Sequence, residues 1–220
     1  MKRHAAAAIL AAGIVALAAP AHTAPQPSEV PLSWVLEIDY ETPRLIQVLL
    51  PGEFKPKTFW YMRYTVINRT GGDRVFVPEF VLYTDTGQVR RAGRKAPTMV
   101  FDAVQKLYND PLLRDVTAMT GVLLQGEDNA KEGVAIWQDI DPVAGTFDVF
   151  IGGLSGETVR IKLPVAVKVE KMDAEGNLHM VEKDEMVLSR TLQLRFAIPG
   201  EASGRSTAPI KLIKENWVMR

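Results

Sequence analysis

The chain has 220 residues, and 26 lysine and arginine side chains are balanced by 26 aspartate and glutamate side chains. Nucleic acid or an anionic membrane surface would call for a basic excess, so neither is expected as a partner. The absence of cysteine excludes cysteine nucleophiles, thiolate metal sites and covalent haem attachment. Because 47% of the residues are hydrophobic, a chain of this length can bury one sizeable core.

The first residues have the three parts of a secretory signal peptide. Lys2 and Arg3 are basic, Ala5 to Ala19 is an uncharged apolar stretch, and Ala19-Pro20-Ala21 fits the small-x-small cleavage pattern. We therefore predict a signal peptide over 1–21 and export to the periplasm or the extracellular space. An uncleaved anchor is the alternative, but the apolar stretch is shorter than the ~20 residues of a spanning helix. No membrane span is expected after cleavage.

Residues 22–32 are rich in proline and small side chains, which predicts a flexible lead. Apolar and acidic residues then alternate over 34–41, as in a half-buried strand. Thr42-Pro43 interrupts this strand, and RLIQVLLP (44–51) predicts a second one.

An aromatic and β-branched run over 59–67 gives the clearest strand signal, with Trp60, Met62, Tyr64 and Val66 on one face. Turn-forming residues fill 68–73, and VFVPEFVLY (75–83) predicts the return strand. Pro78 inside that strand cannot donate a ladder hydrogen bond, so it predicts an edge or a bulge. Asn68-Arg69-Thr70 also matches a glycosylation acceptor; we favour the turn.

One helix is predicted over about 98–109. Thr98 is placed to cap it, and its apolar side would carry Val100, Val104, Leu107 and Tyr108. Asn109-Asp110-Pro111 is expected to end it.

Everything after the helix predicts strands joined by turns. These segments are 121–125, 134–140, 147–154, 159–172, 178–183, 187–198 and 209–218. Helix and strand do not alternate, so a parallel sheet is not expected. We predict an all-β fold in which residues 33–220 form a single antiparallel β-sandwich, with a closed barrel as the alternative.

Few groups in the sequence suit catalysis. After the predicted cleavage site the histidines are His22 and His179, and Gly153-Leu154-Ser155-Gly156 differs from a nucleophile elbow because its second glycine comes one place early. Glu37, Asp39 and Glu41 share a strand face at about 7 Å spacing, which suits a carboxylate-based hydrolase as an alternative. We favour a solvated face, and predict no catalytic residue, no metal and no cofactor.

A polar segment lies between the apolar runs of residues 122–137. Glu127, Asp128, Asn129 and Glu132 offer oxygen atoms of the kind that calcium prefers, although Lys131 would compete for the carboxylates. Gly126 and Gly133 flank the segment and suit a turn between two strands, which is the interpretation we favour. The four residues remain the candidate polar-ligand or metal loop.

Aromatic side chains could alternatively form a sugar-binding platform. Strand aromatics are mostly core residues, so we expect the following residues in the core: Trp34, Trp60, Tyr61, Tyr64 and Trp137.

The segment WYMRYTVINRTGGDRVFVPEFVLYTDTG (60–87) resembles one hairpin of exported bacterial immunoglobulin-like β-sandwich proteins, whose function is not established. The matching residues are Tyr64 to Gly71 and Thr84 to Gly87, and Leu123 to Ala130 and Gly152 to Glu157 extend the resemblance. It implies a β-sandwich and export, without an activity or a catalytic residue. We therefore expect a non-enzymatic exported module that binds a protein or a cell-envelope polymer, or that is structural. The alternatives are a carbohydrate- or calcium-binding domain and a carboxylate-based hydrolase.

Overall fold

A computed structural model describes residues 24–93, 96–173, 177–200 and 209–220. The predicted signal peptide therefore lies outside the described residues. The elements in chain order are β1 (Glu37–Tyr40), β2 (Arg44–Val48), β3 (Lys57–Asn68), β4 (Arg74–Phe76), β5 (Glu79–Thr84), β6 (Val89–Arg91), α1 (Thr98–Tyr108), β7 (Arg114–Asp115), β8 (Gly121–Leu123), β9 (Gly126–Gln138), β10 (Thr146–Gly152), β11 (Thr158–Met172), β12 (Leu178–Ala197) and β13 (Lys211–Met219).

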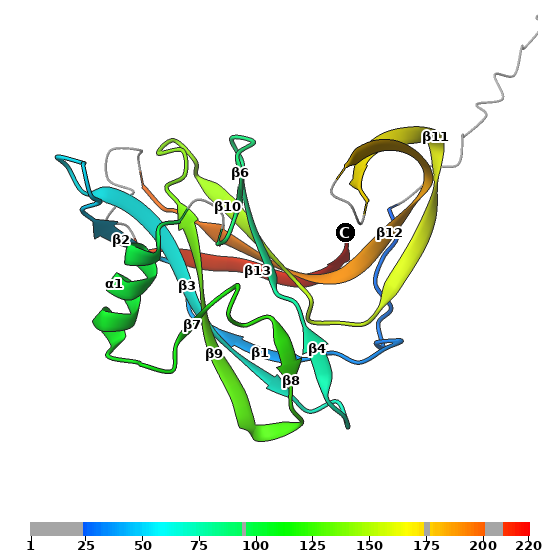
Figure 1. The fold of residues 1–220 in the computed structure, drawn as a ribbon, viewed down its shortest axis with the longest axis horizontal. Coiled ribbons are helices and arrows are strands. Elements are labelled where there is room, and N and C mark those ends of the chain that lie inside the picture. Colours follow the sequence, from blue (N-terminus) through cyan, green and yellow to red (C-terminus); the bar gives the residue numbers. More distant parts are fainter. Residues whose placement is uncertain (1–23, 94–95, 174–176, 201–208) are drawn as a thin grey trace, which may run out of the picture.

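The first sheet is built around β3 and β9 (Figure 1). Its order is β1-β3-β9-β7, and all pairings are antiparallel except the short one between β7 and β9. β1 and β2 pair with successive parts of β3, because Thr42-Pro43 breaks the chain between them as predicted. Proline cannot supply a ladder hydrogen bond, so the interruption follows from the sequence.

The second sheet has the order β11-β12-β10-β5-β6, with β13 paired to β12. β4 and β8 form a separate two-stranded pair. The predicted strand 75–83 is thus two strands: β4 pairs with β8, whereas β5 pairs with β10 and β6. Pro78 lies between them, where the chain passes from one sheet to another.

Two apolar clusters stabilise the fold. The larger contains residues from both sheets, including Trp60, Phe80, Trp137, Phe147 and Phe196, all of them buried. The smaller is formed by the opposite face of β3 and β9 and the inner side of α1, and contains Phe59, Tyr61, Val100, Val104, Leu113, Val134 and Ile136. β3 and β9 are therefore buried on both faces beneath α1.

The helix was predicted within one residue of its observed end, but two details were wrong. Helix α1 begins at Thr98 with Pro97 at the cap position, and no side chain forms a cap hydrogen bond. Leu107 is exposed, because only Val100 and Val104 of α1 reach the core fully. Asn109 ends the helix with a φ of 49°, a left-handed conformation that asparagine tolerates.

Asn68 organises the turn between β3 and β4, in agreement with the turn that we favoured over a glycosylation site at Asn68-Arg69-Thr70. Asn68 is fully buried, and its side-chain amide donates hydrogen bonds to the carbonyl oxygens of Gly72 (2.9 Å) and Leu123 (2.8 Å). Its Oδ1 accepts hydrogen bonds from Thr70. Because the Asn68 amide nitrogen is buried and already donates both hydrogen bonds within the protein, a role in the turn is favoured over a role as a glycosylation site.

The predicted all-β fold with one short helix is confirmed, and its sheets are almost entirely antiparallel. The immunoglobulin-like strand arrangement stays a prediction.

Residues 24–32 contain no strand or helix, although Ser28 is hydrogen-bonded at both its backbone N–H and its carbonyl. Among the described residues, no helix has the length and apolar character needed to cross a membrane.

Candidate functional site

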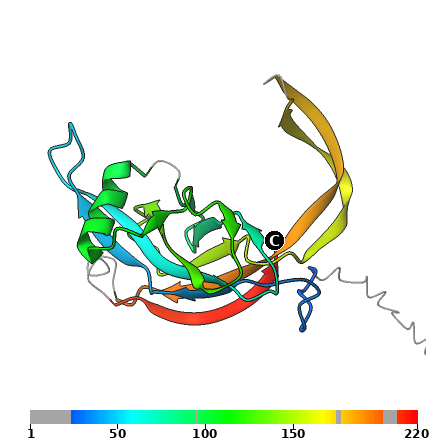
Figure 2. The same cartoon turned by 60° about the horizontal axis from the view of Figure 1, so that its bottom comes forward.

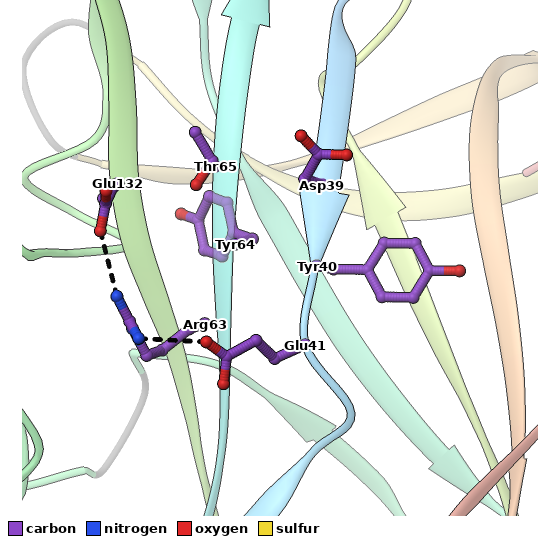
Figure 3. A pocket seen from close by; sticks show the side chains of 7 residues that line it. All are labelled: Asp39, Tyr40, Glu41, Arg63, Tyr64, Thr65 and Glu132. Atoms are coloured by element: carbon purple, nitrogen blue, oxygen red, sulfur yellow. Dashed lines mark hydrogen bonds and ion pairs between the residues drawn. The ribbon is translucent and has the colours of Figure 1, made fainter. Parts of the chain in front are cut away.

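The first candidate site is a small charged pocket on the β1-β3-β9 sheet (Figure 3). It measures about 140 Å³ and is lined by Asp39, Tyr40, Glu41, Arg63, Tyr64, Thr65 and Glu132. The antiparallel register brings these residues together, because it aligns Asp39 with Thr65 and Thr65 with Glu132. Residues directly opposite in such strands share a sheet face.

Arg63 is the centre of this pocket. Its guanidinium donates hydrogen bonds to Glu41 (3.0 Å) and Glu132 (3.1 Å), and it forms an ion pair with Asp110 at 3.6 Å. The same group stacks on the ring of Tyr108, 4.1 Å from its centroid. Arg63 therefore links two strands of the sheet to the end of α1, and the pocket is largely filled by contacts within the protein.

Three tyrosines around this sheet are held in the neutral form. Burial and a hydrogen bond to Glu215 raise the pKa of Tyr40, and burial together with Tyr108 raises the pKa of Tyr61. Burial also raises the pKa of Tyr64, with a smaller contribution from Asp115. A phenol with a raised pKa cannot serve as a general base near neutral pH.

The three carboxylates predicted to share one strand face do so, but they do not form an isolated pair. Glu37 is bound by Arg69 at 3.1 Å, and Glu41 is bound by Arg63 and Arg44. The Asp39 carboxylate forms no hydrogen bond or ion pair with other described residues, and it lies at the side of the pocket in Figure 3. This arrangement supplies an ion-pair network across the sheet.

The turn interpretation of Glu127, Asp128, Asn129 and Glu132 was wrong, because these residues belong to β9. Asn68 pairs with Gly126 and Val66 with Lys131, so residues 127–130 form a bulge in that strand. Three of the four side chains have separate partners: Glu127 binds Arg69, Glu132 binds Arg63, and the Asn129 amide donates to the Gln125 carbonyl. Within the described ranges, no group of three or more histidine, aspartate or glutamate residues is placed to bind a metal.

The aromatic residues lie in the core, as predicted. Trp60, Tyr61, Tyr64 and Trp137 are buried, and Trp34 is partly buried against the larger cluster. The Ser155 hydroxyl donates to the Trp34 carbonyl, whereas His179 contacts Asp173 at the far end of β12. These contacts place Ser155 and His179 in structural roles.

The second candidate site is a long two-stranded ribbon that contains the strands predicted over 159–172 and 178–183. β12 is a single strand of 20 residues, whereas two separate strands were expected there. β13 and β10 pair with it only from Arg190 onward, and β11 pairs with its earlier part. We call β11 together with residues 178–188 of β12 the arm. Figure 2 shows that the arm curves away from the two sheets, as it also does in Figure 1.

The arm exposes large apolar side chains along its whole length. They are Val159, Val165, Val167, Met172, Leu178, Met180, Val181, Met186 and Val187. Leu178 is 65% exposed and Met180 is 61% exposed, so these side chains are in contact with water rather than with the sandwich. An isolated two-stranded ribbon is only marginally stable in water, and clustered exposed apolar residues usually mark an interaction surface.

A buried ion pair fixes the base of the arm. Glu157, just before β11, accepts a 2.8 Å hydrogen bond from Arg190 of β12, and both side chains are 7% exposed. The Ser28 backbone N–H donates to Glu157, and Arg190 donates to the Ser28 carbonyl. Arg190 also lies over the ring of Trp217, 5.0 Å from its centroid. The base of the arm is therefore held by contacts to three separate parts of the chain.

This ion pair makes stability depend on pH. Hydrogen bonds from Arg190 and from the Ser28 backbone lower the pKa of Glu157 below its ordinary value of 4.5. A carboxyl whose pKa is lowered on folding adds stability above its unfolded pKa and loses it as pH falls through the folded pKa. The difference in unfolding free energy between wild type and Glu157→Gln should therefore be largest above pH 4.5 and shrink below it.

Urea denaturation at several pH values measures this difference. The matched control is Glu170→Gln, which makes the same substitution at an exposed glutamate of the arm, away from the Arg190 ion pair. A gap between wild type and Glu157→Gln that stays constant as pH falls would contradict the proposed effect.

Comparison with protein-family models, with curated proteins and with solved structures gave no match. The two candidate sites therefore stand on geometry alone. Sequence reasoning missed the role of Arg63, which depends on three strands meeting at one place. It predicted the strands over 159–172 and 178–183, but it did not predict that they leave the sandwich and expose their apolar side chains.

Proposed function

We propose that this protein is an exported, non-enzymatic β-sandwich module that binds another protein through its arm. The observation that carries the proposal is the row of exposed valine, leucine and methionine side chains on a ribbon that stands clear of the sandwich. Methionine is flexible and polarisable, and it is common on surfaces that adapt to a protein partner. Burying these side chains in an interface would remove the cost of exposing them to water.

The composition of the arm favours a protein over a polysaccharide. Residues 158–188 contain no tryptophan, tyrosine or phenylalanine, which are the side chains that stack on sugar rings. The aromatic residues considered for a sugar platform are packed in the core instead. Two of the carboxylates considered for calcium, Glu127 and Glu132, are bound by arginines. Export is supported by the amino-terminal sequence.

Site-specific photo-crosslinking in the producing cells tests this proposal. A photoreactive residue at Met180 or Val187, both exposed on the arm, should give covalent adducts that mass spectrometry can identify. The matched control is Leu107, which is 61% exposed on α1 and lies outside the arm. The proposal fails if adducts form no more often at Met180 and Val187 than at Leu107.

A further inference from the structure

The two faces of the arm differ in charge. The register pairs Met172 with Leu178, Glu170 with Met180 and Lys168 with Glu182, which places all six on one face. Asp184 and Met186 belong to the same face, because side chains two residues apart in a strand point the same way. This methionine face carries one lysine against three acidic residues among the described residues.

The opposite face, here called the valine face, carries Val167, Val169, Val181 and Val187. Its charged residues are Arg160, Lys162, Lys171, Lys183 and Glu185. Four basic side chains thus stand against one glutamate, with His179 beside them. Each face presents apolar side chains among charges, but the charges are mainly acidic on the methionine face and mainly basic on the valine face.

These properties define what each face can bind. A surface that fits the methionine face needs apolar side chains accompanied by lysine or arginine, and the valine face has both. Packing two methionine faces together would bring acidic groups together, and packing two valine faces together would bring basic groups together. Like charges brought together in an interface are unfavourable, whereas opposite charges set register and orientation.

We propose that the arm binds the arm of a second copy of this chain, with the methionine face of one against the valine face of the other. This inference rests on the proposed function, because it requires the arm to be a docking surface. The two contacting surfaces are different, so the contact is heterologous and leaves one face free on each copy. Association then continues beyond a dimer, as a ring or an open filament.

Two substitutions of adjacent residues test this arrangement. Met180→Lys adds a positive charge to the methionine face and leaves the valine face intact. Val181→Glu adds a negative charge to the valine face and leaves the methionine face intact. Both positions are exposed, so neither change disturbs the core, and circular dichroism should show an unchanged fold.

Light scattering coupled to size-exclusion chromatography, over a concentration series, gives the readout. The wild-type chain should form species larger than a dimer as concentration rises, and each variant alone should stay monomeric. An equimolar mixture of the two variants should form a 1:1 dimer, because each supplies the face that the other has lost. Leu107→Lys is the matched control on the sandwich and should associate like wild type.

Other outcomes overturn the inference. The inference fails if the wild-type chain stays monomeric at every concentration or stops at a dimer. It also fails if the two variants do not associate when they are mixed. Crosslinking separates this failure from failure of the proposed function. Arm adducts with a different protein would overturn self-association and retain the docking function, whereas no arm adducts would overturn both.

Discussion

Replacing Trp60 by alanine is expected to lower the unfolding free energy by about 3–5 kcal/mol, the usual cost of removing a buried tryptophan side chain. Trp60 is 3% exposed on β3 and lies in the larger core cluster. Its ring meets Phe147 edge-on at 5.4 Å between centroids, and its indole N–H donates to Asp139 at 3.1 Å. Alanine removes the packing and also leaves Asp139 without this hydrogen bond.

Urea denaturation followed by circular dichroism measures the loss. Trp60→Phe is the control, because it keeps an aromatic ring in the core and removes only the indole N–H together with part of the ring volume. It should cost clearly less than Trp60→Ala. A loss below about 1 kcal/mol for Trp60→Ala would be incompatible with a core position.

The second large effect is expected at Gly153, where β10 leads into the segment before the arm. Its φ is +85°, and a Cβ added there would lie 2.2 Å from the Val77 carbonyl oxygen. Gly153→Ala combines the strain of a left-handed backbone, about 1–3 kcal/mol, with an overpacking cost of about 1–3 kcal/mol. We therefore expect a loss of about 2–6 kcal/mol, because the contact is to backbone that cannot easily move.

The neighbouring Gly152 provides a matched control. A Cβ at Gly152 would lie 3.6 Å from the Cβ of Glu79, an ordinary van der Waals contact, and its φ is not in the left-handed region. Gly152→Ala should therefore be tolerated far better than Gly153→Ala in thermal denaturation. Equal losses for the two variants would show that the close approach to Val77 does not constrain this position.

Local sequence predicted much of the fold because local rules act on few residues. Thr42-Pro43 ended one strand and Asn109 ended α1 in a left-handed conformation, whereas Pro78, expected at an edge or a bulge of one strand, separates β4 from β5. Each of these outcomes depends on the backbone of one or two residues. The prediction that Thr98 caps the helix was wrong, because no side chain forms a cap hydrogen bond at the start of α1.

The candidate sites were harder to predict because they depend on residues distant in sequence. Arg63 joins Glu41, Asp110 and Glu132, which lie in three distant parts of the sequence. Glu127 to Glu132 looked like a turn because polar residues lay between glycines, but Gly126 and the residues from Lys131 onward pair with β3, and residues 127–130 form a bulge within β9. The hydrogen bonds of the partner strand outweighed the local turn preference.

The sequence by itself determined the strand-rich fold, the position of α1 and the aromatic core, because alternation and turn residues act locally. The tertiary structure decided which alternating segments became covered. β3 and β9 are buried on both faces because the larger core covers one face and α1 packs over the other, whereas residues 158–188 alternate apolar and polar side chains and remain exposed. Alternation places side chains on a face, but only the packing of other elements determines whether that face meets protein or water.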